Sequence, residues 1–550
     1  KLDVFYERNA RGVFVFDGSQ GPLASSNPSD TWGTGNPSLD SLADFLAGYV
    51  ATNNAHITSG NLQRIYNLNG VNFFFQDTWK ATPNLTLNYG LNWLYQSPIY
   101  SPGNDISTFI PADGGITYTG QHGLNTLWPR DYHDFGPRFG FAWQPKGSGK
   151  LVVRGGYGVF YQVPNVNYFG DNHTGNGGAT GINDNPPVYN VSNQTPFQIV
   201  DGVPIFGSGT VPPPPYGAFS VSQHFVTGYA QNTNFNVQYQ LNSSSVLEVG
   251  YTGSLSRHLP VTLDINQIPA GAPEVNSSRP YAGQFPNLAA INEVQSVGNG
   301  YYNGAIVSLR TANYHRFGMK LNYTYGHSKD DDSFNRGIVP QNSYCLRCDY
   351  GNSDYDVRHS FVTFLTYSLS DPSRWKALLG GWQLNSLLTF YTGQPFTVFS
   401  GQDTSGTGEN TDRAQVVGNP FQGVPPASPP NYVYWFNPSA FALPAAGTYA
   451  NQPRNEYYGA PTRQIDFSIF KTTHITERVS LQLRAEIFNI FNFRDLAPPN
   501  GGLGAPIGAS NVVASSGLGQ ITQTLDVFNG APGIGTGAPR NVQLAAKIVF

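Results

Sequence analysis

The chain has 550 residues, of which 12% are charged, compared with roughly 25% in an ordinary soluble domain. Its 30 Lys and Arg residues are scattered and the formal net charge is −4, which excludes the basic stripe needed to bind nucleic acid. The 62 Gly and 41 Pro argue against long helices, and no apolar run approaches the roughly 18 to 20 residues of a membrane helix. If the chain spans a membrane, it must therefore do so with strands closed into a barrel.

Long strands with a period of two follow one another along the chain. From Leu85 to Tyr95, every second side chain is apolar or aromatic and the intervening ones are mostly polar. Most such segments have about 10 to 15 residues, longer than the about 5 to 6 usual in globular sheets and enough for the about 9 to 11 of a membrane strand. We expect fourteen strands, near residues 2–16, 62–78, 85–97, 136–145, 150–162, 228–241, 245–256, 302–312, 316–328, 357–369, 380–399, 462–472, 478–492 and 540–550.

The connections between these strands alternate strictly in length. Short ones lie near 81–84, 145–149, 242–244, 313–315, 370–379 and 473–477. Long ones lie near 17–61, 98–135, 163–227, 257–301, 329–356, 401–461 and 493–539. Outer-membrane barrels place short turns in the periplasm and long loops outside, and their lumen is polar. The sequence therefore predicts an all-β fold: a transmembrane antiparallel barrel with long extracellular loops and short periplasmic turns.

The last expected strand ends at Phe550, with Val542, Leu544, Ala546 and Ile548 on the same face. This strand resembles the last strand of bacterial outer-membrane proteins, whose terminal aromatic residue is a signal for the barrel-assembly machinery. The alternative is an ordinary terminal strand. We expect Phe550 to be an assembly signal and the chain to lie in the bacterial outer membrane.

Several segments resemble the barrel of TonB-dependent receptors, specifically the Oar-like group with a carboxypeptidase-regulatory-like front domain. They lie at 71–91, 134–143, 356–361 and 380–396, and the most specific is Arg-Ala-Glu-Ile-Phe-Asn-Ile-Phe-Asn at 484–492. The resemblance implies a barrel of roughly 22 strands with a plug in its lumen. It predicts that residues 1–550 are the C-terminal portion of such a barrel, with the plug, the TonB-contact segment and the front domain preceding Lys1. A complete fourteen-stranded barrel is the competing interpretation.

The sequence offers few candidates for catalysis. Asp131, His133 and Asp134 are the nearest approach to an acid–base cluster, and a solvated loop is the preferred interpretation. The ten His residues show no His-Glu-x-x-His spacing and no paired metal pattern. We expect no catalytic residue, no cofactor and no enzyme activity.

The expected outer loop at 329–356 carries two notable features. Cys345 and Cys348 lie in oxidising territory there, so a small local disulfide is expected rather than a redox or zinc role. The same loop is acidic, and carboxylate oxygens could bind Ca²⁺. A solvated polar loop is the preferred interpretation, with a metal as the alternative; the acidic residues are Asp330, Asp331, Asp332, Asp349, Asp354 and Asp356.

Two functions of different class fit these features. The first is a TonB-dependent transporter that moves a bulky substrate across the outer membrane, with outer-membrane lipid, the barrel-assembly machinery and TonB as partners. The second is a structural or surface-interaction barrel whose long loops bind other molecules. The sequence does not name the substrate, because a fold does not determine function.

Overall fold

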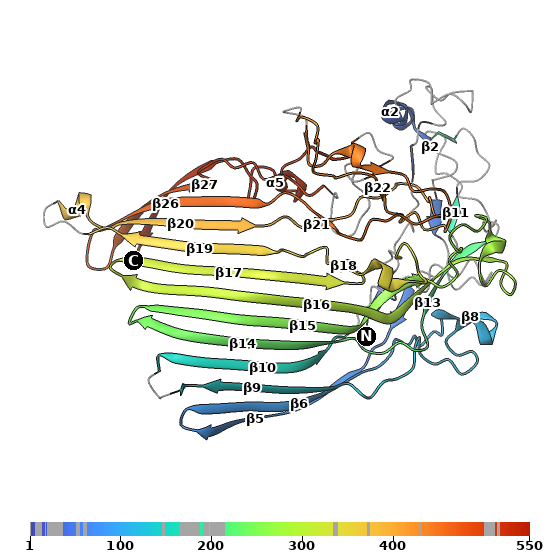
Figure 1. Cartoon of the computed structure of the whole chain (residues 1–550), viewed down its shortest axis with the longest axis horizontal. Helices are drawn as coiled ribbons and strands as arrows, with labels where there is room; N and C mark the ends of the chain where they lie inside the picture. The colour runs from blue at the N-terminus through green and yellow to red at the C-terminus, as the bar shows by residue number, and fades with distance from the viewer. Residues whose placement is uncertain are drawn as a thin grey trace.

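One large antiparallel sheet dominates the chain (Figure 1). The computed structural model describes residues 2–5, 14–16, 18, 37–50, 56–58, 63–145, 149–163, 165, 169, 188–190, 197–198, 215–333, 339–370, 375–427, 432–499, 512–513 and 517–550. Thirteen strands in these residues pair in chain order: β5 (Gly70–Thr82), β6 (Leu85–Gln96), β9 (Phe135–Trp143), β10 (Leu151–Tyr161), β14 (Tyr229–Asn242), β15 (Ser245–Asp264), β16 (Leu288–Tyr314), β17 (Phe317–Asp330), β19 (His359–Ser368), β20 (Trp382–Tyr391), β26 (Thr462–His474), β27 (Ser480–Phe488) and β29 (Asn541–Val549). Two shorter strands, β13 (Tyr216–Val221) and β18 (Gly351–Asn352), pair with β16 and β17 at the loop end.

The register keeps the two faces of the sheet distinct. Leu91 pairs with Phe75 on one side and Pro137 on the other, whereas its neighbour Asn92 pairs with Phe74 and Gly136. Directly paired residues point to the same face. Leu91 therefore lies on the face that Leu87, Tyr89 and Trp93 share, opposite Asn88 and Asn92, as the alternation predicts.

The connections gather by length at opposite ends of the sheet, as Figure 1 shows. Two residues each separate β5 from β6, β14 from β15 and β16 from β17. The long connections carry small two-stranded sheets of their own: β7 (Ser107–Ile110) with β8 (Gly115–Tyr118), β21 (Pro395–Phe396) with β25 (Tyr457–Tyr458), β22 (Gln415–Val416) with β24 (Phe441–Ala442), and β23 (Val433–Tyr434) with β28 (Gln520–Ile521). The predicted segregation of short turns and long loops is confirmed.

Apolar side chains are fully buried mainly among these long connections. One cluster surrounds Tyr66, Trp128, Phe169 and Phe225, and a second surrounds Phe396 and other residues of 396–441. Apolar side chains of the sheet face remain exposed instead, including Phe73, Leu91, Phe139 and Leu544. The loop end thus has ordinary water-excluding cores, whereas the wall of the sheet presents apolar residues outward.

Several predicted boundaries are wrong. The strand expected at 62–78 is two strands, β4 (Gln63–Tyr66) and β5, and β4 pairs with β1 (Leu2–Phe5). The strand expected at 2–16 is thus represented by β1 outside the large sheet, and residues 6–13 lie outside the described part of the chain. The strand expected at 302–312 extends to the 27 residues of β16, because its loop half alternates less clearly in sequence. The strand expected at 380–399 ends at Tyr391.

Helices are short in the part of the chain that the structure describes. The longest, α2 (Pro37–Ala47), has 11 residues and lies in the long N-terminal connection. The others are single turns, α4 (Lys376–Leu379) and α5 (Leu525–Phe528). No described helix is both long and apolar enough to cross a membrane.

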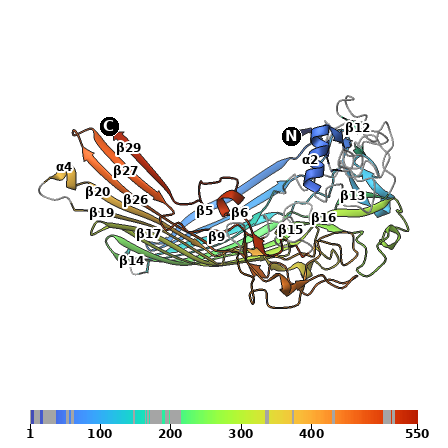
Figure 2. The same cartoon turned by 90° about the horizontal axis from the view of Figure 1, so that it is seen from above.

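The large sheet is curved, and its described edges are β5 and β29 (Figure 2). Each of the thirteen strands is antiparallel to the next, so the first and the thirteenth run in the same direction. Bacterial outer-membrane barrels of a single chain have an even number of antiparallel strands. If this sheet closes into a barrel through antiparallel pairs alone, an odd number of additional strands must lie between β29 and β5, because thirteen plus an odd number is even.

Candidate functional site

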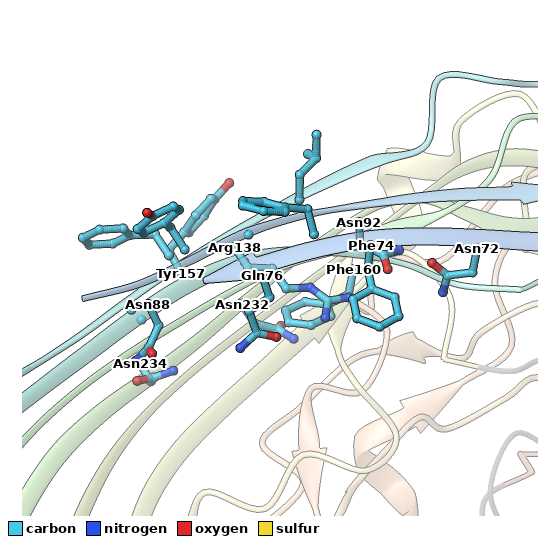
Figure 3. Close-up of a pocket in the computed structure, with 18 residues that line it drawn as sticks. Asn72, Phe74, Gln76, Asn88, Asn92, Arg138, Tyr157, Phe160, Asn232 and Asn234 are labelled. Atoms are coloured by element: carbon cyan, nitrogen blue, oxygen red, sulfur yellow. The ribbon is translucent and has the colours of Figure 1, made fainter. Parts of the chain in front are cut away.

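A cavity of about 770 Å³ lies along strands β5, β6, β9, β10 and β14. On the polar face of these strands, amide side chains line it from three of the five, β5, β6 and β14 (Figure 3). They are Asn72, Gln76, Asn88, Asn92, Asn232 and Asn234. Arg138 is the one charged side chain among the described residues that line the cavity, and its guanidinium carbon lies 4.7 Å from the centre of the Phe160 ring. The geometry is that of a cation–π contact.

Glycines form the floor of this polar face. Gly90 pairs with Arg138, and Gly156 pairs with both Gly140 and Asn234. A Cβ atom at Gly90 would lie 2.6 Å from the carbonyl oxygen of Phe75, too close for any side chain without a backbone shift. The glycines therefore leave space on the polar face beside the amide side chains of neighbouring strands.

The polar side chains of this wall are mainly hydrogen-bonding amides. Amide groups donate and accept hydrogen bonds, and a single arginine adds one positive charge. The described lining contains no Asp, Glu, His, Ser or Cys that could act as a base or nucleophile. The period of two predicted a polar face, but the glycine floor and the cavity depend on lateral strand neighbours.

Two arginines from a distant part of the chain form ion pairs with three carboxylates of the acidic outer loop. Arg454 forms an ion pair with Asp330 and lies 3.6 Å from a carboxylate oxygen of Asp354. Arg413 lies 2.5 Å from Asp349. Burial raises the pKa of Asp349 and lowers that of Arg413, and the opposite charge of each partner counteracts the shift.

Sequence reasoning did not identify these two arginines. They lie 64 and 124 residues beyond Asp349 and Asp330 along the chain, so no local pattern links them. One signal was available: six acidic residues in one loop require counter-charges if the loop is ordered and buried.

The metal alternative for Asp330, Asp331 and Asp332 gains no support from the described residues. Asp330 accepts hydrogen bonds from Ser333 and pairs with Arg454, and Asp331 accepts two from Asn299, at 2.8 and 2.9 Å. No three His, Cys, Asp or Glu side chains converge on a possible metal position anywhere in the described ranges.

The remaining candidate residues also have defined positions. Cys345 and Cys348 are joined by a disulfide in the same loop. His133 is exposed and contacts Asp131 at 2.9 Å, while Asp134 is buried, which raises its pKa to about 6. Phe550 follows the last strand and is 92% exposed.

These features define an outer-membrane type of β-barrel wall, with an apolar face, a polar face and loops at one end. A family model described as an outer membrane beta barrel domain matches residues 1–543, and the chain belongs to this family. The chain is accordingly an outer-membrane β-barrel protein, and its location is the bacterial outer membrane. Comparison of the sequence with curated proteins gives no match.

Solved structures with a similar fold have low sequence identity. The siderophore receptor PirA from Acinetobacter baumannii is 10% identical with a TM-score of 0.41, and the match covers 88% of this chain and 46% of the receptor. The ferric enterobactin receptor PfeA from Pseudomonas aeruginosa is 10% identical with a TM-score of 0.43, and the match covers 88% of this chain and 45% of the receptor. The outer membrane transporter YddB from Escherichia coli is 10% identical with a TM-score of 0.42, and the match covers 89% of this chain and 55% of the transporter. The chain spans about half the length of these structures or less.

Proposed function

We propose that the chain is the C-terminal part of the barrel wall of a TonB-dependent-type transporter that moves a bulky substrate across the outer membrane. The observation that supports this most is the continuous polar face, on which amides and glycines line the cavity between β5 and β14. A wall that faces a permeating solute or a plug needs hydrogen-bonding groups and little bulk. The resemblance of 484–492 and other segments to TonB-dependent receptors supports the same function.

The parallel edges β5 and β29 support the proposal that further barrel strands belong to the same protein. Strands, a plug and a TonB-contact segment ahead of Lys1 would complete a transporter. Its partners would then be outer-membrane lipid, the barrel-assembly machinery and TonB.

The experiment compares which compounds cells remove from their medium when the full-length protein is present, absent, or present without functional TonB. We expect a set of compounds whose depletion requires both the protein and TonB. The double variant Asn232→Trp and Asn234→Trp, which adds bulk to the polar face, should reduce this depletion at least several-fold. The matched control Tyr239→Trp changes the apolar face of the same strand and should leave depletion unchanged.

The competing function is a structural or surface-interaction barrel. The buried ion pairs and the apolar cluster around Phe396 and Phe436, which order the outer loops, favour a fixed binding surface. Unchanged depletion in all strains, together with loss of surface binding when the loops are altered, would support this function over transport.

A further inference from the structure

The connection between β19 and β20 differs from the other short turns. It runs from 369 to 381 and carries the single helical turn α4, whereas three other turns at this end have two residues each. Figure 1 shows α4 beyond the ends of the neighbouring strands, on the side opposite the long loops. In an outer-membrane barrel this is the periplasmic side.

This turn exposes three large apolar side chains at its described positions. Trp375 is 74% exposed, Leu378 63% and Leu379 51%. The backbone N–H groups of Leu378 and Leu379 both donate to the carbonyl oxygen of Trp375, at 2.9 Å each, and so close one helical turn. Exposed apolar side chains that lie close together in the chain are a feature of interaction and membrane-contact sites.

Two contacts attach α4 to the apolar face of the sheet. The indole N–H of Trp382 donates to the carbonyl oxygen of Leu378 at 3.0 Å, and the ammonium group of Lys471 donates to that of Gly380 at 2.6 Å. Trp382 and Lys471 are register partners, and they belong to the face on which Leu384 pairs with Ile469. The helical turn is therefore held at the periplasmic end of the lipid-facing surface.

We propose that the α4 turn is an interfacial anchor that inserts Trp375, Leu378 and Leu379 into the periplasmic leaflet of the outer membrane. The occupant of this surface is phospholipid, because the turn is continuous with the lipid-facing wall of β20 and β26. Tryptophan is the residue type enriched where hydrocarbon meets head groups, and a lysine with a long stem places its charge there. The proposal rests on the outer-membrane location and not on the transport function.

The test uses the full-length protein, with its native disulfide intact, in phosphatidylcholine and phosphatidylethanolamine vesicles. An environment-sensitive fluorophore is attached at Leu378→Cys and, as the matched control, at Ser243→Cys in the turn between β14 and β15. We expect blue-shifted emission at 378, quenching by doxyl-labelled lipid several-fold stronger than at 243, and weaker quenching by aqueous iodide. Equal iodide quenching at the two positions would overturn the proposal.

A second measurement avoids the label. Brominated lipid should quench less of the total tryptophan fluorescence in Trp375→Phe than in the natural sequence, and an unchanged quenched fraction would contradict the anchor. Protection of position 378 in cells but not in pure lipid vesicles would show that a periplasmic protein covers the turn, and would also overturn the proposal.

Discussion

The guanidinium of Arg413 lies 2.5 Å from the carboxylate of Asp349, and both side chains are almost fully buried, at 5% and 6% exposure. This pair joins the disulfide loop to the long loop that follows β20, and Arg413 also donates to the carbonyl oxygen of Cys348 at 3.4 Å. Asp349 immediately follows Cys348, so the covalent and the ionic links act on the same backbone.

Replacing Arg413 with Ala should loosen these two loops without unfolding the sheet. The change leaves the Asp349 charge buried without its ion-pair partner, which costs about 3 to 5 kcal/mol. Hydrogen exchange of 339–358 and 401–416 should become faster, while heat-modifiable migration of the folded barrel should persist. The control Arg347→Ala removes an exposed charge from the same loop and should leave exchange unchanged.

We expect the stability of the outer loops to depend on pH through Glu409. Burial, followed by the hydrogen bond with Asp264, raises its pKa from 4.5 to about 9. A raised pKa means that the folded loop favours the protonated carboxyl, so the stabilisation is complete below pH 4.5 and is lost as the pH rises through about 9. Protection of 401–413 from hydrogen exchange, corrected for intrinsic rates, should fall over this window.

Glu409→Gln should retain that protection at high pH, because the amide cannot ionise. Glu274→Gln, at an exposed loop position, should show the same pH dependence as the natural sequence. A natural protein whose loop protection did not change with pH would contradict the prediction.

A charge should destabilise the protein much more on one face of β6 than on the other. Leu91→Arg places a charge near the middle of a strand on the lipid-facing side and should destabilise the folded protein by about 2 to 4 kcal/mol. Asn92→Arg places the same charge one residue later on the polar face and should cost much less. Denaturant titration in lipid vesicles measures both, and equal losses would refute the assignment of the faces.

Cys345 and Cys348 should resist labelling in intact, unreduced cells, because the two thiols are joined to each other. After mild reduction both should react with an impermeant thiol reagent, since the loop lies outside the cell. Ready modification of both residues without reduction would count against the disulfide, and resistance after reduction would count against the outside location.

Deleting Phe550 or replacing it with Lys should impair assembly in cells more than intrinsic stability. Its ring is 92% exposed in this structure, where β29 pairs with β27 alone among the described strands. Because the ring is exposed, losing it should cost less than the about 1.5 to 3 kcal/mol of a buried side chain, and a charge near the membrane boundary should cost about 0 to 1 kcal/mol. Recognition by strand addition depends on the same edge.

The measurement for Phe550 compares the amount of folded barrel in cells with refolding of the same full-length variant in lipid. Normal insertion of the variants in cells would show that Phe550 is only the end of a strand. A parallel change at Ile548, which lies on the same face of β29 two residues earlier, controls for simple loss of an apolar side chain from that face.

The sequence alone determined the membrane-barrel fold, the two faces of its strands and the separation of short turns from long loops. These properties are local, because alternate residues of an extended chain point to opposite faces whatever their partners are. The positions of β6, β10 and β14 were therefore predicted within one or two residues.

Only the tertiary structure showed which residues far apart in the sequence contact one another. The pairing of Arg454 with Asp330 spans 124 residues, and the cavity near Arg138 requires five strands in a specific lateral order. The extension of β16 to 27 residues and the pairing of β1 with β4 likewise depend on neighbours and not on local alternation. Ion pairs, register and cavities are properties of side chains that converge after the chain has folded, so a period of two carries no information about them.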